Sequence, residues 1–114
     1  MIEELIDKTF HIRDASHIAH WKTKSYSEHM ALGDYYEDII EKIDEIIEAY
    51  QGTFGIIGKV EEQDADIAKS INDMVIWLNE NRSEIARNVP SIENIVDELT
   101  ALNMRTLYKL ENLR

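Results

Sequence analysis

Apolar residues recur at steps of three and four along most of this 114-residue chain, which is the spacing of one face of an α-helix. No stretch alternates with period two for long enough to predict a strand. Breaks are expected at a cluster of glycines, Gly52, Gly55 and Gly58, and at the single proline, Pro90. The pattern therefore predicts four helical segments, at residues 2–24, 26–51, 62–82 and 91–113.

The second segment has the cleanest helical pattern. Its apolar face runs from Tyr36 through a series of isoleucines to Tyr50. Ser25 is followed three residues later by Glu28, the spacing of a capping box, in which each side chain binds the other residue's backbone N–H. Gly52 is expected to end this helix as its C-terminal cap.

The third and fourth segments are separated by Pro90. Ile67, Ile71, Met74 and Leu78 mark the third, whose polar continuation at residues 79–82 leaves room for a bend or break. Pro90 and Ser91 are expected to start the fourth, with Ser91 as its cap. One side of that helix is lined by Ile92, Ile95, Leu99, Leu102, Thr106, Leu110 and Leu113.

Short connections between four helices favour an all-α fold, an antiparallel four-helix bundle. A chain of 114 residues is long enough for one hydrophobic core and short for two, so residues 1–114 are predicted to form a single helical domain.

Composition and charge narrow the function. The formal charge of −11 argues against nucleic acid as a partner, because a phosphate backbone is bound by an excess of Lys and Arg. The chain has no cysteine, so a metal would be held by His, Asp and Glu. No apolar run approaches the roughly 18 residues of a membrane span, and no signal-peptide pattern opens the chain. These features predict a cytoplasmic protein with no membrane partner.

The turn between the first two segments concentrates the candidate chemistry. Three of the four histidines lie within residues 17–29. His20 and His29 are followed by Asp44 and Glu48, which together make a set of two imidazoles and two carboxylates. Within one helix His29 and Asp44 are roughly 22 Å apart, because each residue adds about 1.5 Å. A shared metal ion would therefore need a partner chain.

The His20-Trp21 pair, the short turn, His29, and then Asp44 and Glu48 resemble Dps, the miniferritin branch of the ferritin-like superfamily. The resemblance covers residues 12–52 and implies a ferritin-like homo-oligomer that binds iron or another divalent metal. It also implies that His20 and His29 of one chain share the metal with Asp44 and Glu48 of another. Ferroxidase-type iron oxidation is the one activity it suggests, and binding without turnover is the favoured prediction.

Two departures from that family bear on the assembly. The chain is shorter than a full Dps subunit, and the turn between His20 and His29 is tighter than the family usually has. Both argue against a twelve-subunit shell and iron storage. The His-x-x-His-Trp opening is also similar to small phage proteins.

A second interpretation treats the same turn as a site for a small anion. Cationic side chains and free backbone N–H groups at a helix start bind phosphate, and an aromatic ring can stack on a base. This predicts a phage-type protein that sequesters a small nucleotide in the host cytoplasm. The residues would be Arg13, His17, Trp21, Lys22, Lys24 and Tyr26.

Plainer interpretations remain open. Asp44 and Glu48 would then belong to a solvated acidic face, and Lys22 and Lys24 would offset nearby carboxylates. The chain could also be a helical adaptor that presents aromatic side chains such as Trp77 to a partner. The sequence contains no nucleophile elbow, P-loop or cysteine nucleophile, so conventional catalysis is not predicted.

Overall fold

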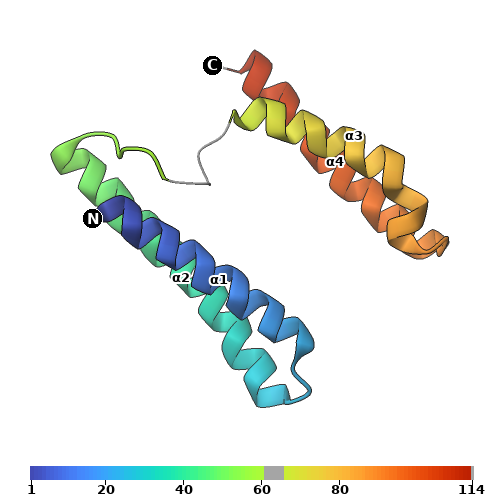
Figure 1. Ribbon diagram of the computed structural model, residues 1–114, viewed down its shortest axis with the longest axis horizontal. Helices are drawn as coiled ribbons and strands as arrows, with labels where there is room; N and C mark the ends of the chain where they lie inside the picture. Colours follow the sequence, from blue (N-terminus) through green and yellow to red (C-terminus); the bar gives the residue numbers. More distant parts are fainter. Residues whose placement is uncertain (61–65, 114) are drawn as a thin grey trace. The chain divides into compact units, whose positions relative to one another are not determined.

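The computed structural model describes residues 1–60 and 66–113, which form four α-helices and no strand (Figure 1). These are α1 (Ile2–Lys22), α2 (Tyr26–Phe54), α3 (Ile67–Ala86) and α4 (Pro90–Asn112). The all-α prediction is confirmed. Residues 62–65, where the third helix was expected to begin, lie outside the described residues. In the part that is described, none of the helices has both the length and the apolar character needed to cross a membrane.

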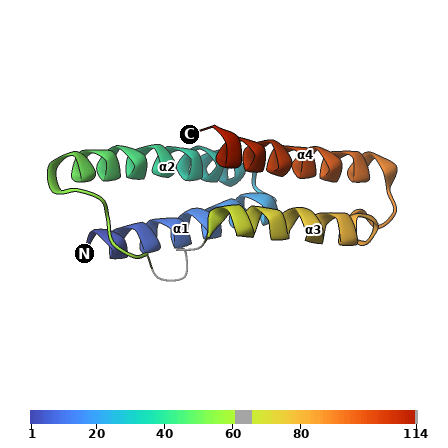
Figure 2. The same ribbon diagram turned by 90° about the horizontal axis from the view of Figure 1, so that it is seen from above.

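The chain divides into two compact units, Met1–Asp64 and Ala65–Arg114. In the first unit α1 packs along α2, and in the second α3 packs along α4 (Figures 1 and 2). Each pair is a helical hairpin with a three-residue connection, at residues 23–25 and 87–89. Whether the two hairpins join into one antiparallel, ferritin-like bundle stays a prediction.

The start of α2 follows the expected capping chemistry in part. The Ser25 side chain accepts a hydrogen bond from the Glu28 N–H at 3.3 Å. Glu28 does not return the bond to Ser25. Its carboxylate instead accepts from the Thr23 hydroxyl at 2.7 Å, and Thr23 in turn accepts from the Ser25 N–H. Thr23 therefore completes the cap that the sequence pattern assigned to Glu28.

The predicted end of α2 at Gly52 is wrong. The helix continues to Phe54, and Gly55 is its C-terminal cap with φ of 99°. That angle lies where side chains with a Cβ are strained, so a glycine suits the position. Gly52 lies inside the helix with no atom of another group within 4 Å of a Cβ added there.

The α3–α4 connection also differs from expectation. No break interrupts α3 at residues 79–82, and the helix ends at Ala86, followed by Arg87 and Asn88 with φ of 51° and 62°. The cap of α4 is Val89, not Ser91. Pro90 occupies the first helical position, where its fixed φ suits the helix and its missing N–H costs nothing, so Ser91 already lies inside.

The first unit has a compact apolar core at the end of the hairpin opposite the turn at residues 23–25. Ile6, Ile43 and Val60 are buried, and the partly buried residues packed against them are Phe10, Ile40, Ile47 and Ile57. The segment after α2 returns to α1, where the Gly58 N–H donates to the Glu3 carboxylate at 2.9 Å. This bond lowers the pKa of Glu3 below its ordinary value.

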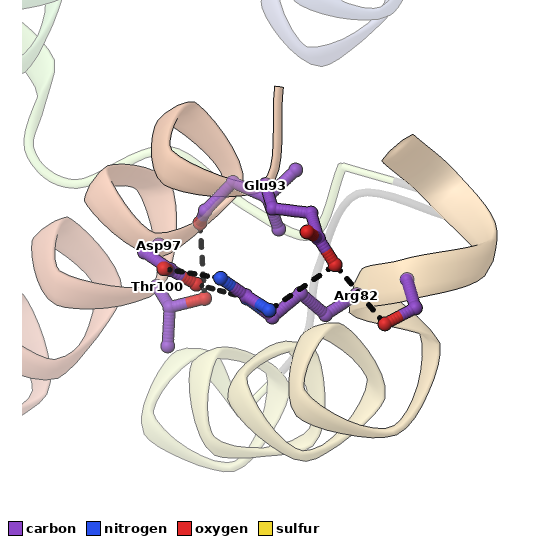
Figure 3. A network of polar contacts seen from close by, with 6 residues as sticks. Arg82, Glu93, Asp97 and Thr100 are labelled. Atoms are coloured by element: carbon purple, nitrogen blue, oxygen red, sulfur yellow. Dashed lines mark hydrogen bonds and ion pairs between the residues drawn. The ribbon is translucent and has the colours of Figure 1, made fainter. Parts of the chain in front are cut away.

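An ion-pair network joins the two helices of the second unit (Figure 3). Arg82 of α3 donates two hydrogen bonds to Asp97 of α4, from Nε at 2.6 Å and from Nη2 at 2.9 Å. It also reaches Glu93 at 3.2 Å, and Glu93 accepts from the Ser83 hydroxyl. Among the described residues of this unit only Leu78 and Ala86 are buried.

Two faces of α4 have different surroundings. Its partly buried positions include Glu93, Val96, Thr100, Asn103 and Leu107, spaced by three and four residues. Glu93 contacts Arg82, so this face is turned toward α3. The apolar members of the predicted stripe are all exposed, between 42% and 64%. We call these the α4 stripe: Ile92, Ile95, Leu99, Leu102, Leu110 and Leu113.

Candidate functional site

The turn between α1 and α2 is closed by two histidines that bind each other's backbone. His20 Nδ1 lies 2.6 Å from the carbonyl oxygen of His29, and His29 Nδ1 lies 2.9 Å from the carbonyl oxygen of His20. The two rings stack, with centroids 3.7 Å apart and planes inclined by 20°. We call this reciprocal pair the histidine clasp. It joins the last turn of α1 to the first turn of α2.

The clasp determines which ring nitrogen carries a proton. A carbonyl oxygen can only accept a hydrogen bond, so Nδ1 must be the donor in both histidines. Within residues 1–60 and 66–113, Nε2 of either ring has no hydrogen-bond partner. Both side chains are half-buried. In the neutral form each ring therefore keeps a lone pair on Nε2 that the protein itself does not use.

Gly33 makes the close approach of the two helices possible. A Cβ added there would lie 3.1 Å from His20 Cε1 and 3.4 Å from its Nδ1. Glycine inside a helix costs about 1 kcal/mol relative to alanine, so its presence one turn after His29 calls for a packing reason. Sequence reasoning missed this residue, and the isolated glycine in a periodic helix was the signal that could have identified it.

The clasp belongs to a larger set of contacting rings, which we call the ring cluster. His17 stacks on Tyr36 at 3.9 Å between centroids and contacts Trp21 at 4.4 Å. Tyr36 also meets the His20 ring edge to face at 5.4 Å. The Arg13 guanidinium lies 5.4 Å from the Tyr36 centroid, a cation–π distance. Tyr36 had been placed only in the apolar face of its helix, and the structure adds it to the site.

The residues of the nucleotide interpretation fall into two groups. Arg13 and His17 are engaged within the chain, since Arg13 pairs with Asp14 at 3.2 Å and His17 belongs to the ring cluster. The other four, Trp21, Lys22, Lys24 and Tyr26, are exposed, with Trp21 at 69% and Tyr26 at 78%. Neither lysine forms an ion pair within the described ranges. Lys24 lies in the turn, because α1 ends at Lys22.

Asp44 and Glu48 lie farther along α2, away from the clasp. Both side chains are exposed, and neither is ion-paired within residues 1–60 and 66–113. Asp44 borders an apolar cavity of about 260 Å³ between the core residues of α1 and α2. No group of three His, Asp or Glu side chains able to hold a metal is found in the portion of the chain that the structure describes.

Comparison with known proteins identifies a family. Residues 20–110 match a family described only as a family of unknown function, DUF5856. No curated protein and no solved structure matches the chain. The matched range starts at His20 and includes His29, Gly33 and Tyr36, as well as most of the second hairpin. Because it spans 91 of the 114 residues, the chain belongs to the DUF5856 family.

Proposed function

We propose that this protein is a homo-oligomer that binds a divalent metal of the iron type. His20 and His29 of one chain would supply two ligands, and Asp44 and Glu48 of a second chain would supply the others. The observation that supports this most directly is the histidine clasp. It leaves the Nε2 atoms of two half-buried histidines without a hydrogen-bond partner among the described residues.

The hydrogen bonds of the clasp are those expected around a histidine ligand. A metal-binding imidazole usually donates its other ring N–H to a carbonyl or carboxylate, which sets the tautomer and the direction of the ring. In this chain both Nδ1 atoms face carbonyl oxygens, at 2.6 and 2.9 Å. The tautomer of both rings is therefore set before any ion binds. Because the stacked rings are inclined by only 20°, binding one ion through both Nε2 atoms requires the rings to turn apart.

The carboxylates must come from another copy. Asp44 is fifteen residues after His29 in the uninterrupted helix α2, a rise of roughly 22 Å. Both Asp44 and Glu48 are exposed and one helical turn apart, so they present two oxygen ligands on one face. Imidazole nitrogen with carboxylate oxygen suits iron, manganese and zinc. The first unit also carries 6 Lys and Arg against 15 Asp and Glu, a charge that attracts cations.

The first test separates the clasp from the ligand role. Asn can place its side-chain N–H where Nδ1 lies but has nothing at the position of Nε2. The double variant His20→Asn, His29→Asn should keep its helicity and lose bound Mn²⁺ or Zn²⁺, measured by equilibrium dialysis with elemental analysis. His11→Asn, on an exposed histidine of α1 outside the ring cluster, is the matched control and should bind as the wild type does. Full occupancy in the double variant would refute the proposal.

The second test asks whether two chains share each ion. A chain with His20→Asn and His29→Asn is mixed with one carrying Asp44→Asn and Glu48→Gln, and each alone should bind no metal. In mixed dimers of two-fold symmetry one of the two sites is intact, so random mixing should restore roughly one quarter of the wild-type occupancy. No recovery on mixing would contradict a shared site.

Nucleotide binding is a second candidate, supported by the exposure of Trp21 and Tyr26 near Lys22 and Lys24, which form no ion pair with any described residue. An exposed ring can stack on a base while Lys22 and Lys24 contact phosphate. Titration with ADP and with a cyclic dinucleotide tests this candidate. Trp21→Ala with Lys24→Ala should weaken binding at least tenfold, whereas Trp77→Ala, which removes the other tryptophan, should not. Equal affinity in all three proteins would eliminate it.

A further inference from the structure

The second hairpin leaves large apolar side chains exposed on both of its helices. All six members of the α4 stripe are 42% to 64% exposed, and on α3 Trp77 is 51% and Ile67 is 59% exposed. The stripe repeats at steps of three and four along α4, with Thr106 in its fifth position. That repeat is the pattern of a helix that packs against another helix along its length.

The exposed area is that of a protein interface. With Ile67, Met74 and Trp77 of α3, the α4 stripe makes nine large apolar side chains that are 38% to 64% exposed, on the order of several hundred Å² of apolar surface. A stable interface buries about 800 Å² on each partner, apolar and polar surface together. The exposed apolar surface of this hairpin is therefore of the size that one side of a stable dimer buries.

The formal charges of the two units indicate what covers the α4 stripe. The first unit has a formal charge of −9, from 6 Lys and Arg against 15 Asp and Glu. The second unit has 6 against 8, a charge of only −2. Two copies of the second unit can therefore approach with little repulsion, whereas two copies of the first repel strongly. We propose that the α4 stripe is the interface between two copies of this chain, joined through their α3–α4 hairpins.

If two chains pair in this way, the four-helix arrangement forms between chains, in place of the predicted bundle within one chain. The inference does not depend on the proposed metal site, which lies on the first unit. It does supply the second copy that the metal site requires. Two acidic first units tethered to one dimer meet at a high effective concentration, so their own surfaces need not attract each other.

Sedimentation equilibrium of the full chain at micromolar concentrations tests the interface. The wild type should have twice the 13.3 kDa monomer mass. The double variant Leu99→Asp, Leu102→Asp should be a monomer with unchanged helicity by circular dichroism, its dissociation constant raised at least tenfold. Ile12→Asp with Ile18→Asp is the matched control, since these residues of α1 are 46% and 47% exposed. It should remain a dimer. A monomeric wild type, or an α4 variant that stays dimeric, would overturn the proposal.

Cross-linking gives a readout that does not depend on a destabilising change. The chain has no cysteine, so any disulfide formed by a single-cysteine variant must join two chains. Mild oxidation of Leu99→Cys and Leu102→Cys should give a covalent dimer at a rate at least tenfold above Ile12→Cys. Equal rates would contradict the interface, and they are the result expected if the chain's own first hairpin covered the stripe.

Salt and the histidine variants separate this inference from the proposed function. Each chain carries −11, so association through an apolar interface should tighten as salt screens the repulsion. Weakening with salt would contradict it. His20→Asn with His29→Asn should leave the dimer mass unchanged even where metal is lost. A dimer that binds no metal refutes the metal site alone, and a metal-binding monomer refutes both the interface and the shared site.

Discussion

The two hairpins have helices of similar length but differ in the contacts between them. Their helices have 21 and 29 residues in the first unit and 20 and 23 in the second, so size does not separate them. The first unit places isoleucines between its helices and its histidines at the turn. The second places Arg82 and two carboxylates between its helices and leaves the α4 stripe outside.

This contrast suggests that the two hairpins have different roles. Two helices that pack only on each other share one contact surface, so only some of their side chains can lie in it. The first unit uses that surface for its core and for the ring cluster, which organises the clasp. The second adds an ion-pair network between its helices, and its α4 stripe stays exposed. We infer that chemistry belongs to the first hairpin and assembly to the second.

The largest expected effect comes from Leu78, the one large aliphatic side chain that is buried in the described part of the second unit. Leu78 is 3% exposed, and Leu78→Ala should lower the free energy of unfolding of that unit by about 2–4 kcal/mol, since buried Leu→Ala changes leave a cavity. Urea unfolding followed at Trp77 measures it, in a Trp21→Phe background. Met104→Ala, at a residue 56% exposed, should cost less than about 0.5 kcal/mol. Equal losses would remove the distinction between buried and exposed faces.

A somewhat smaller effect is expected where the two helices of the first unit approach most closely. Gly33→Leu should push the His20 ring out of the clasp and cost about 1–3 kcal/mol, the range for overpacked sites. Gly52→Leu is the control, because nothing lies within 4 Å of its added Cβ and the helix gains roughly 0.8 kcal/mol of propensity. Thermal unfolding should shift in opposite directions for the two variants. A shift in the same direction would show that Gly33 is not a contact position.

The clasp itself should contribute less. His20→Ala leaves the His29 carbonyl without its donor and should cost about 1 kcal/mol, as for a typical hydrogen bond. His20→Asn should recover part of that loss, because its amide can donate to the same oxygen. Urea unfolding of both variants gives the comparison. A His20→Asn variant no more stable than His20→Ala would show that ring stacking, and not the hydrogen bond, closes the turn.

The smallest expected effect is on the stability of the second unit at acid pH. The Arg82 guanidinium holds the pKa of Asp97 below its ordinary value of 3.8, so the ionised carboxylate stabilises the folded state above that pH. The stabilisation is lost as pH falls through the lowered pKa. Arg82→Met should therefore flatten the fall in stability of the second unit below about pH 4. Melting curves at acid pH measure this. Lys42→Met, which breaks an exposed pair with Glu45 within α2, should leave that slope unchanged.

Local features of the fold were predictable and contacts between helices were not. Periodicity located four helices, and Ser25 was correctly placed as a cap, because both depend on residues within one turn. The choice between Gly52 and Gly55 as the end of α2 could not be made, since both glycines permit the same backbone angles. The pattern of α4 showed an apolar face without showing that α3 packs against a different one.

For the candidate site, too, the sequence predicted positions along the chain but not contacts between helices. His20 and His29 could be assigned to opposite sides of one turn from their positions alone. Their reciprocal bonds depend on the distance between two helix axes, which Gly33 controls and which no spacing within a single helix reveals. Tyr36 entered the site for the same reason. The roles of Asp44 and Glu48 depend on a second chain and stay predictions.

The three-residue connections also govern when each part of the protein can form. Within each hairpin the packed helices are neighbours in the chain, so little loop entropy opposes their contact, and such local contacts form rapidly. Once residues 1–60 have emerged from the ribosome, α1 and α2 can pack on each other while later parts of the chain are still inside it. The histidine turn can thus be complete in the nascent chain. The α4 stripe leaves the ribosome later, so the proposed pairing of two chains can begin only after the first hairpin has been released.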